Sequence, residues 1–166
     1  MIRAPLKSLA IMSLLCIFAM HSLAQPFTEL TTASITGIEK GDAAWGDYDR
    51  DGDLDLLITG HTGSNEFTAL YRNDNGTFTD TNAPLQNLSE GSVDWGDYDN
   101  DGDLDILLTG YYWQWITDPF GGRSRVQTAV SSIYYNDAGL FYLKSGLGDI
   151  SAAVIGDGKW GDYDND

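Results

Sequence analysis

The chain has 166 residues, a formal net charge of −16 and a single cysteine. A chain this acidic repels nucleic acid and anionic lipid surfaces, so both are excluded as general partners, while cations are favoured. Five Trp, nine Tyr and a hydrophobic content of 42% argue for a packed fold, although high charge alone is typical of disorder.

Residues 1–24 are predicted to be a signal peptide. Arg3 and Lys7 precede an apolar run over residues 9–20, and the small residues that end at Ala24 fit a cleavage site. The run is shorter than the roughly 20 residues of a membrane-spanning helix. Cleavage removes the cysteine and two of the nine basic residues but none of the 25 acidic ones, which leaves a net charge of −18. We therefore expect a secreted or cell-surface protein with no disulfide and no membrane insertion after cleavage.

An internal repeat with a period of 50 organises the rest of the chain. The segment Trp45–Gly60 returns almost letter for letter as Trp95–Gly110, and its beginning returns once more from Trp160. Residues 70–78 similarly resemble residues 133–141. The sequence thus predicts two full units and a truncated third, over about 36–86, 87–149 and 150–166.

Each unit is predicted to contain four strands and no helix. In the first unit one strand ends at Trp45, the next two cover about 54–59 and 69–73, and the last starts at Phe78. The continuous apolar run Leu56-Leu57-Ile58 is typical of a strand buried on both faces. Asn75-Gly76 indicates a hairpin turn, as does Ala138-Gly139 in the second unit. Four strands in a unit of this length predict all-β blades of a β-propeller.

The ends of the sequence suggest that the propeller is incomplete. Phe27-Thr28-Glu29 resembles Phe78-Thr79-Asp80, so the mature chain begins like the last strand of a blade. The third unit stops inside its acidic loop. Since a propeller needs at least four blades, we expect this chain to be a fragment of a longer one.

The acidic loop after each Trp-Gly pair predicts a metal site. Carboxylates stand at positions 1, 3, 5 and 9 of the first loop, which are Asp47, Asp49, Asp51 and Asp55. Ca²⁺ takes six to eight oxygen ligands, and Gly52 at position 6 permits the sharp turn that gathers them. Asp53 at position 7 is expected to offer its backbone carbonyl, while its side chain adds charge or supports the ligands. The alternative is a solvated acidic turn without metal.

The loop recurs in the other two units. The second copy contains Asp97, Asp99, Asp101, Asp103 and Asp105, with Gly102 at position 6. The third copy has only Asp162, Asp164 and Asp166, and it lacks the glycine and the later ligand. An EF-hand is excluded because position 12 is Ile58 or Leu108 instead of glutamate, and because no helix is expected beside it.

The Trp-Gly-Asp-Tyr-Asp-x-Asp-Gly-Asp-Leu-Asp segments resemble FG-GAP/VCBS-type repeats, the units of the integrin α-chain N-terminal propeller and of many secreted bacterial proteins. The resemblance covers nearly all of residues 27–166. It implies a propeller with calcium in the loop between the first two strands of a blade. The implied ligands are Asp47, Asp49, Asp51 and Asp55, then Asp97, Asp99, Asp101 and Asp105. The resemblance implies no single activity.

The second unit contains an insertion. Tyr71 follows Gly60 by 11 residues, whereas Tyr134 follows Gly110 by 24. The insertion is expected to be a loop, and it holds Tyr111, Tyr112, Trp113, Trp115, Arg123 and Arg125. These side chains could bind a glycan or a protein. The alternative is that the rings pack the loop onto its own blade.

No catalytic residues are predicted, because the clustered carboxylates are assigned to metal and His61 has no Ser or Cys partner pattern. The sequence favours an exported binding or adhesion module for a protein or glycan, with calcium in a structural role. The alternative is the accessory propeller domain of a secreted carbohydrate-active enzyme, such as a polysaccharide lyase, whose catalytic part would lie beyond residue 166.

Overall fold

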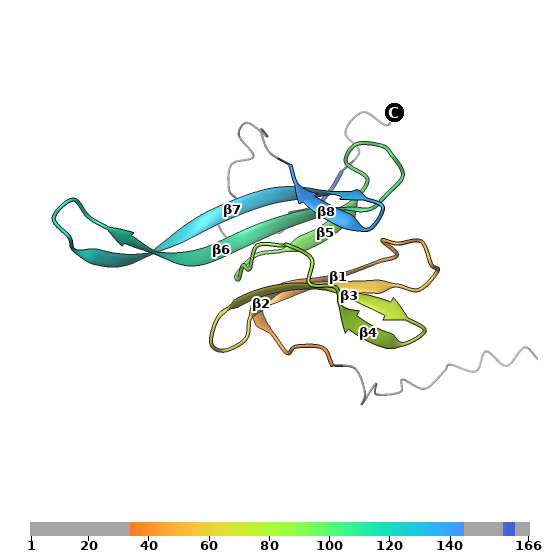
Figure 1. Ribbon diagram of the computed structural model, residues 1–166, viewed down its shortest axis with the longest axis horizontal. Helices are drawn as coiled ribbons and strands as arrows, with labels where there is room; N and C mark the ends of the chain where they lie inside the picture. Colours follow the sequence, from red (N-terminus) through yellow and green to blue (C-terminus); the bar gives the residue numbers. More distant parts are fainter. Residues whose placement is uncertain (1–33, 145–157, 162–166) are drawn as a thin grey trace, which may run out of the picture.

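The computed structural model describes residues 34–144 and 158–161, and all its regular structure is β. The strands are β1 (Glu39–Gly46), β2 (Asp55–His61), β3 (Glu66–Asp74), β4 (Thr77–Asp80), β5 (Val93–Gly96), β6 (Asp105–Thr117), β7 (Arg123–Asp137) and β8 (Leu140–Leu143). They form two antiparallel sheets in sequential order, sheet A from β1–β4 and sheet B from β5–β8. The sheets lie against each other (Figure 1). The described residues contain no helix that is long and apolar enough to cross a membrane.

This architecture confirms the predicted all-β fold with blade-like, four-stranded units. The four strands of sheet A lie where the first unit was expected to have them. The unit boundaries themselves stay predictions, and residues 1–24 and 27–29 lie outside the described part of the chain.

The inner strand of sheet A is buried on both faces, as its apolar run predicted. Leu57 is fully buried in the core between the sheets, where it joins Leu70 of sheet A and Ile106 of sheet B. Leu56 and Ile58 point to the opposite face and pack in a second cluster, beneath residues of the segment that leads into β1. Alternate side chains of one strand thus supply two cores, which is why the run has no polar interruption.

The two predicted hairpin turns are present. Asn75 and Gly76 have φ angles of 53° and 87°, and Ala138 and Gly139 have 51° and 88°. Two consecutive positive φ values define a type I′ turn, whose twist matches that of the flanking antiparallel strands. The turns close the β3–β4 and β7–β8 hairpins.

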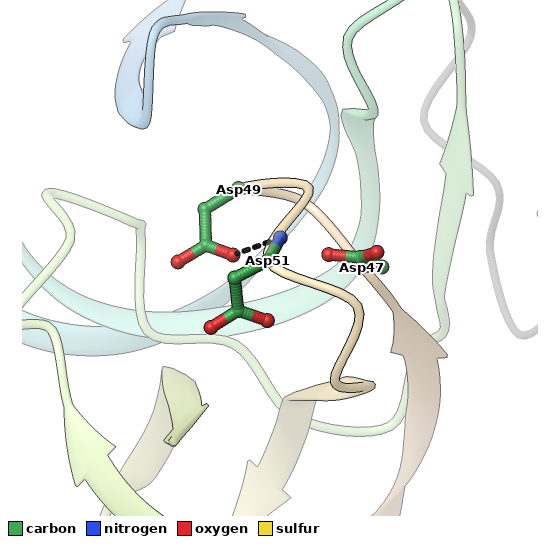
Figure 2. Close-up of side chains that lie close together, drawn as sticks. All are labelled: Asp47, Asp49 and Asp51. Carbon is green, nitrogen blue, oxygen red and sulfur yellow. Dashed lines mark hydrogen bonds between the residues drawn. The ribbon is translucent and has the colours of Figure 1, made fainter. Parts of the chain in front are cut away.

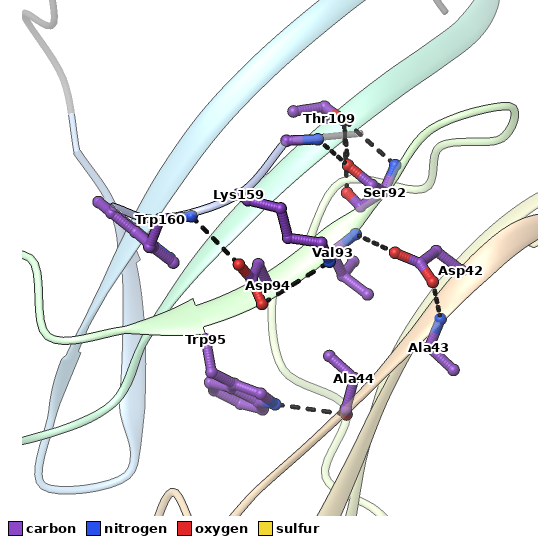
Figure 3. Close-up of polar contacts among 11 residues, drawn as sticks. Asp42, Ala43, Ala44, Ser92, Val93, Asp94, Trp95, Thr109, Lys159 and Trp160 are labelled. Atoms are coloured by element: carbon purple, nitrogen blue, oxygen red, sulfur yellow. Dashed lines mark hydrogen bonds and ion pairs between the residues drawn. The ribbon is translucent and has the colours of Figure 1, made fainter. Parts of the chain in front are cut away.

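A tryptophan of sheet B rests on a glycine of sheet A. A Cβ atom added to Gly46 would lie 2.8 Å from Cδ1 of Trp95, so only glycine leaves room for the indole ring. The ring donates its Nε1–H to the Ala44 carbonyl at 3.3 Å and stacks on Tyr48 with a centroid separation of 6.1 Å. Figure 3 shows this contact between the sheets.

The same step recurs at the next unit. Trp160 lies over Gly96, where an added Cβ atom would be 2.6 Å from Cδ1 of the Trp160 ring. The backbone N–H of Trp160 donates to Asp94 at 3.1 Å (Figure 3). Trp45, the corresponding residue of the first unit, is 55% exposed. The tryptophan of one Trp-Gly pair thus packs on the glycine of the pair in the preceding unit, and this contact links neighbouring units.

The insertion of the second unit differs from the expected loop. Its residues lengthen β6 and β7, whose pairing continues from Ile106↔Tyr134 to Thr117↔Arg123. The hairpin projects well beyond the rest of the molecule (Figure 1). The expectation was wrong because the inserted residues are rich in aromatic and β-branched side chains, which favour extended pairing once the flanking strands have set the register.

Candidate metal-binding loops

Each acidic loop connects the first two strands of its sheet. Residues 47–54 lie between β1 and β2, and residues 97–104 lie between β5 and β6. Two residues in each loop have a positive φ, at positions 4 and 6: Arg50 (59°) and Gly52 (97°), then Asn100 (57°) and Gly102 (90°). The glycine adopts this angle without steric cost, and the reversal folds the carboxylates inward.

In the first loop, three carboxylates converge. Ligand oxygens of Asp47, Asp49 and Asp51 lie within 4.8 Å of one another (Figure 2). The loop is tightened from within, because Asp49 accepts the N–H of Asp51 at 3.3 Å and Asp47 accepts that of Gly52 at 3.1 Å. The second oxygen of Asp47, Oδ1, is buried and has no hydrogen-bond partner among the described residues. Buried carboxylate oxygens are normally satisfied, so an unpartnered one beside two other carboxylates fits a cation ligand.

The second loop gathers Asp97, Asp99 and Asp105, again within 4.8 Å of one another. Asp97 accepts the N–H groups of Asp101 and Gly102 at 3.1 and 2.9 Å, the latter matching a bond of the first loop. Asp101 accepts a backbone N–H of its own loop and does not join the cluster. The clusters share positions 1 and 3, while the first adds position 5 and the second position 9.

Position 9 is a fully buried aspartate in both loops. Asp55 accepts the N–H of Tyr48 at 3.1 Å and of Asn73 at 2.9 Å. Asp105 accepts the equivalent N–H groups of Tyr98 and Asn136, each at 2.7 Å. Burial raises the pKa of both carboxyls above the ordinary value, and these hydrogen bonds oppose the rise.

At position 7 the side chains turn away from the clusters. Asp53 accepts the N–H of Asn75 in the β3–β4 turn at 2.7 Å. Asp103 forms an ion pair with Arg50 of the first loop, which joins the loops of neighbouring sheets. A supporting role for both side chains, with the backbone carbonyl left for metal, stays a prediction. The third loop, Asp162, Asp164 and Asp166, lies outside the described residues.

Two asparagines that the sequence analysis did not single out hold the loops in place. Asn73 donates from Nδ2 to the Leu54 carbonyl at 3.0 Å, and Asn136 donates to Leu104 at 3.3 Å. Each also accepts the N–H of the glycine in the following hairpin turn, at 2.7 Å. Both asparagines occur in Tyr-x-Asn-Asp segments directly before a hairpin turn, and this recurrence could have indicated their role. An asparagine side chain can donate and accept hydrogen bonds at the same time.

The donor set of these loops suits a hard divalent cation. The clustered ligands are carboxylate oxygens, which Ca²⁺ and Mg²⁺ prefer. The flexible, many-oxygen loop favours Ca²⁺, since Mg²⁺ demands a near-ideal octahedron and keeps much of its water. Two unit charges 4.8 Å apart repel by about 3 kcal/mol at an effective dielectric constant near 20, and by less where solvent and salt screen them. A bound cation would remove that repulsion.

The fold and the loops together define a class of protein: repeats of β-propeller type, built from four-stranded blades with an acidic loop after the first strand. The comparison with family models agrees. Residues 47–108 match the model of the FG-GAP-like repeat, which confirms the resemblance read from the sequence. Repeats of this family are typically binding modules of extracellular proteins, without catalysis, and often bind calcium. The chain matches no curated protein and no solved structure.

Proposed function

We propose that this chain is an exported, calcium-stabilised propeller module that binds or adheres to an extracellular protein or glycan. Calcium has a structural role in the proposal and occupies the loops at Asp47–Asp55 and Asp97–Asp105. The predicted signal peptide supports export. The observation that carries the calcium assignment is the convergence of three carboxylates in each loop, with the buried Oδ1 atom of Asp47 lacking a donor among the described residues.

The physical link between metal and fold is direct. Each loop joins two strands and is tied to the next hairpin through its buried position-9 aspartate and its partner asparagine. A cation that holds the loop therefore also holds three strands. Because a ligand that binds only the folded state stabilises it by mass action, calcium should raise the melting temperature.

The test is a thermal melt of the chain without its predicted signal peptide, followed by β-sheet circular dichroism in calcium and in chelator. Calorimetric titration of calcium measures the stoichiometry in parallel. Asp49→Asn is expected to lower the number of bound ions by one, because it removes one of the converging charges. Asp80→Asn is the matched control, since Asp80 is an exposed residue of β4 outside the acidic loops. A cooperative melt that is indifferent to calcium would refute the metal assignment.

A further inference from the structure

The free part of the β6–β7 hairpin sorts its side chains onto two faces. Trp113 pairs with Gln127, Trp115 with Arg125, and Thr117 with Arg123. Because directly paired residues and alternate residues of a strand share a face, both tryptophans and both arginines point the same way. We call the surface formed by Trp113, Trp115, Arg123 and Arg125 the Trp–Arg face.

Diagonal contacts order these four side chains. The guanidinium carbon of Arg123 lies 5.4 Å from the centre of the Trp115 ring, and that of Arg125 lies 5.0 Å from the centre of Trp113. Both are cation–π contacts, which hold the guanidinium groups in place at a small cost in side-chain entropy. Trp113 and Trp115 nevertheless remain 43% and 62% exposed. The alternative reading, in which the rings pack the insertion onto its blade, does not account for this exposure.

The Trp–Arg face also carries positive charge that the surrounding structure leaves available. Four other basic residues of the described chain form ion pairs with nearby carboxylates: Lys40 with Glu90, Arg50 with Asp103, Arg72 with Asp74, and Lys159 with Asp94. Lys144 lies over the rings of Tyr98 and Tyr135 instead. Arg125 also has an acidic neighbour, Glu66, but their separation of 4.0 Å is the longest among these ion pairs, so the charge of Arg125 is only partly offset. Arg123 has no acidic partner among the described residues. In a chain with a net charge of −16, this face is a local concentration of positive charge, which attracts anions.

The shape of the hairpin limits the kind of anion. Two strands about 4.8 Å apart, over five residues of about 3.3 Å each, offer a strip of a few hundred Å² at most, against about 800 Å² per partner in a stable protein interface. A narrow, exposed strip of this kind suits an extended polymer lying along it. Flat indole rings can receive the apolar faces of sugar rings, and guanidinium forks match carboxylates in a bidentate manner.

We propose that the Trp–Arg face binds a linear polysaccharide that carries carboxylate groups, a polyuronate. Sugar rings pack on Trp113 and Trp115, and uronate carboxylates pair with Arg123 and Arg125. The proposal rests on the proposed binding function and names the chemical class of its ligand. It assigns that ligand to the second unit, since the corresponding β2–β3 turn of the first unit has no such extension.

The test is calorimetric titration of the full chain with short oligogalacturonides in buffered calcium; short oligomers avoid calcium-linked gels. Binding is expected for the unaltered chain. It should weaken about tenfold or more in R123A/R125A, because hydrogen bonds to charged groups are lost, and also in W113A/W115A. The matched control K40A/R72A removes the same number of charges from sheet A and should bind like the unaltered chain. A neutral galactan of similar length should bind at least tenfold more weakly than the oligogalacturonides, because it has no carboxylates to pair with the arginines.

Three results would overturn the proposal: the chain fails to bind oligogalacturonides, it binds polyglutamate as tightly as oligogalacturonides, or K40A/R72A loses as much affinity as R123A/R125A. Equal binding of polyglutamate would show attraction by charge alone, or a peptide partner. Melting temperatures in calcium, recorded for every variant, separate this test from the calcium proposal. If calcium stabilises the chain and the oligomers do not bind, only the hairpin assignment fails. If the oligomers bind and calcium has no effect, the hairpin assignment stands and the metal role fails.

Discussion

Replacing Gly46 by alanine tests how the sheets are joined. The added Cβ would lie 2.8 Å from Cδ1 of Trp95 and 2.9 Å from two further ring atoms, closer than real Cβ contacts. The neighbour in question is a bulky ring set between the two sheets, so it cannot swing away as the end of a flexible chain would. We expect the ring to shift, which lengthens its hydrogen bond to Ala44 and breaks its alignment with Tyr48.

The expected loss of stability follows from these contacts. Overpacking of a well-packed site costs about 1–3 kcal/mol. A lost aromatic pair adds about 0.5–1.5 kcal/mol, and a weakened neutral hydrogen bond adds about 1 kcal/mol or less. The terms overlap because one movement of Trp95 causes all of them, so we expect Gly46→Ala to cost about 3 kcal/mol. That is a large share of the roughly 5–15 kcal/mol that stabilises a typical domain.

The assay is equilibrium unfolding in urea at fixed calcium, followed by circular dichroism. Gly161→Ala is the matched control, because Gly161 occupies the same place in the Trp-Gly pair of the third unit and an added Cβ would meet nothing within 4 Å. The control should unfold within about 0.5 kcal/mol of the unaltered chain, as surface substitutions usually do. If both variants unfold alike, the ring-on-glycine step does not stabilise the pair of sheets.

Two further predictions concern the support of the acidic loops. Asn136→Ala should lower the free energy of unfolding in urea by about 2–3 kcal/mol, and by more than Asn73→Ala, because the buried Asn136 also donates to the carbonyl of Tyr48 in the acidic loop of the first unit at 3.1 Å. Equal losses for the two variants would contradict this. In calcium-free buffer, the raised pKa values of Asp55 and Asp105 stabilise the fold at low pH, and this contribution should fall as pH rises from the ordinary value of 3.8 through the folded values. Unfolding free energies from acid to neutral pH should therefore decline more steeply for the unaltered chain than for D55N/D105N, and parallel curves would refute the assignment.

The repeat made much of the fold predictable from the sequence. A segment that returns after 50 residues is expected to form the same local structure twice, so the acidic loops and the strands on either side of them were expected at the same places in both units. The two hairpin turns followed from the second recurrence, that of residues 70–78 at residues 133–141. The double burial of Leu56-Leu57-Ile58 followed from its unbroken apolar run. The pattern of carboxylates likewise predicted which side chains gather, although each loop brings together three of the four expected positions.

Features that depend on contacts between units were not predictable in the same way. The Trp-Gly pair was visible as a repeated motif, but only the packing of one sheet on another shows that the glycine of one unit receives the ring of the next. The role of Asn136 is hidden for the same reason, since Tyr48 lies 88 residues away in the chain. The insertion was misread because its length suggested a loop, whereas its composition supports paired strands.

The acidic loops and the long hairpin lie at opposite ends of the sheets (Figure 1). The units are almost identical at the end with the loops and differ in length at the other, where the spacing is 24 residues against 11. A segment such as Tyr112–Thr128 could therefore be transplanted into the short turn between β2 and β3 without disturbing the acidic loops. A scaffold of this kind can change the surface that it presents, one hairpin at a time, while its acidic loops stay constant.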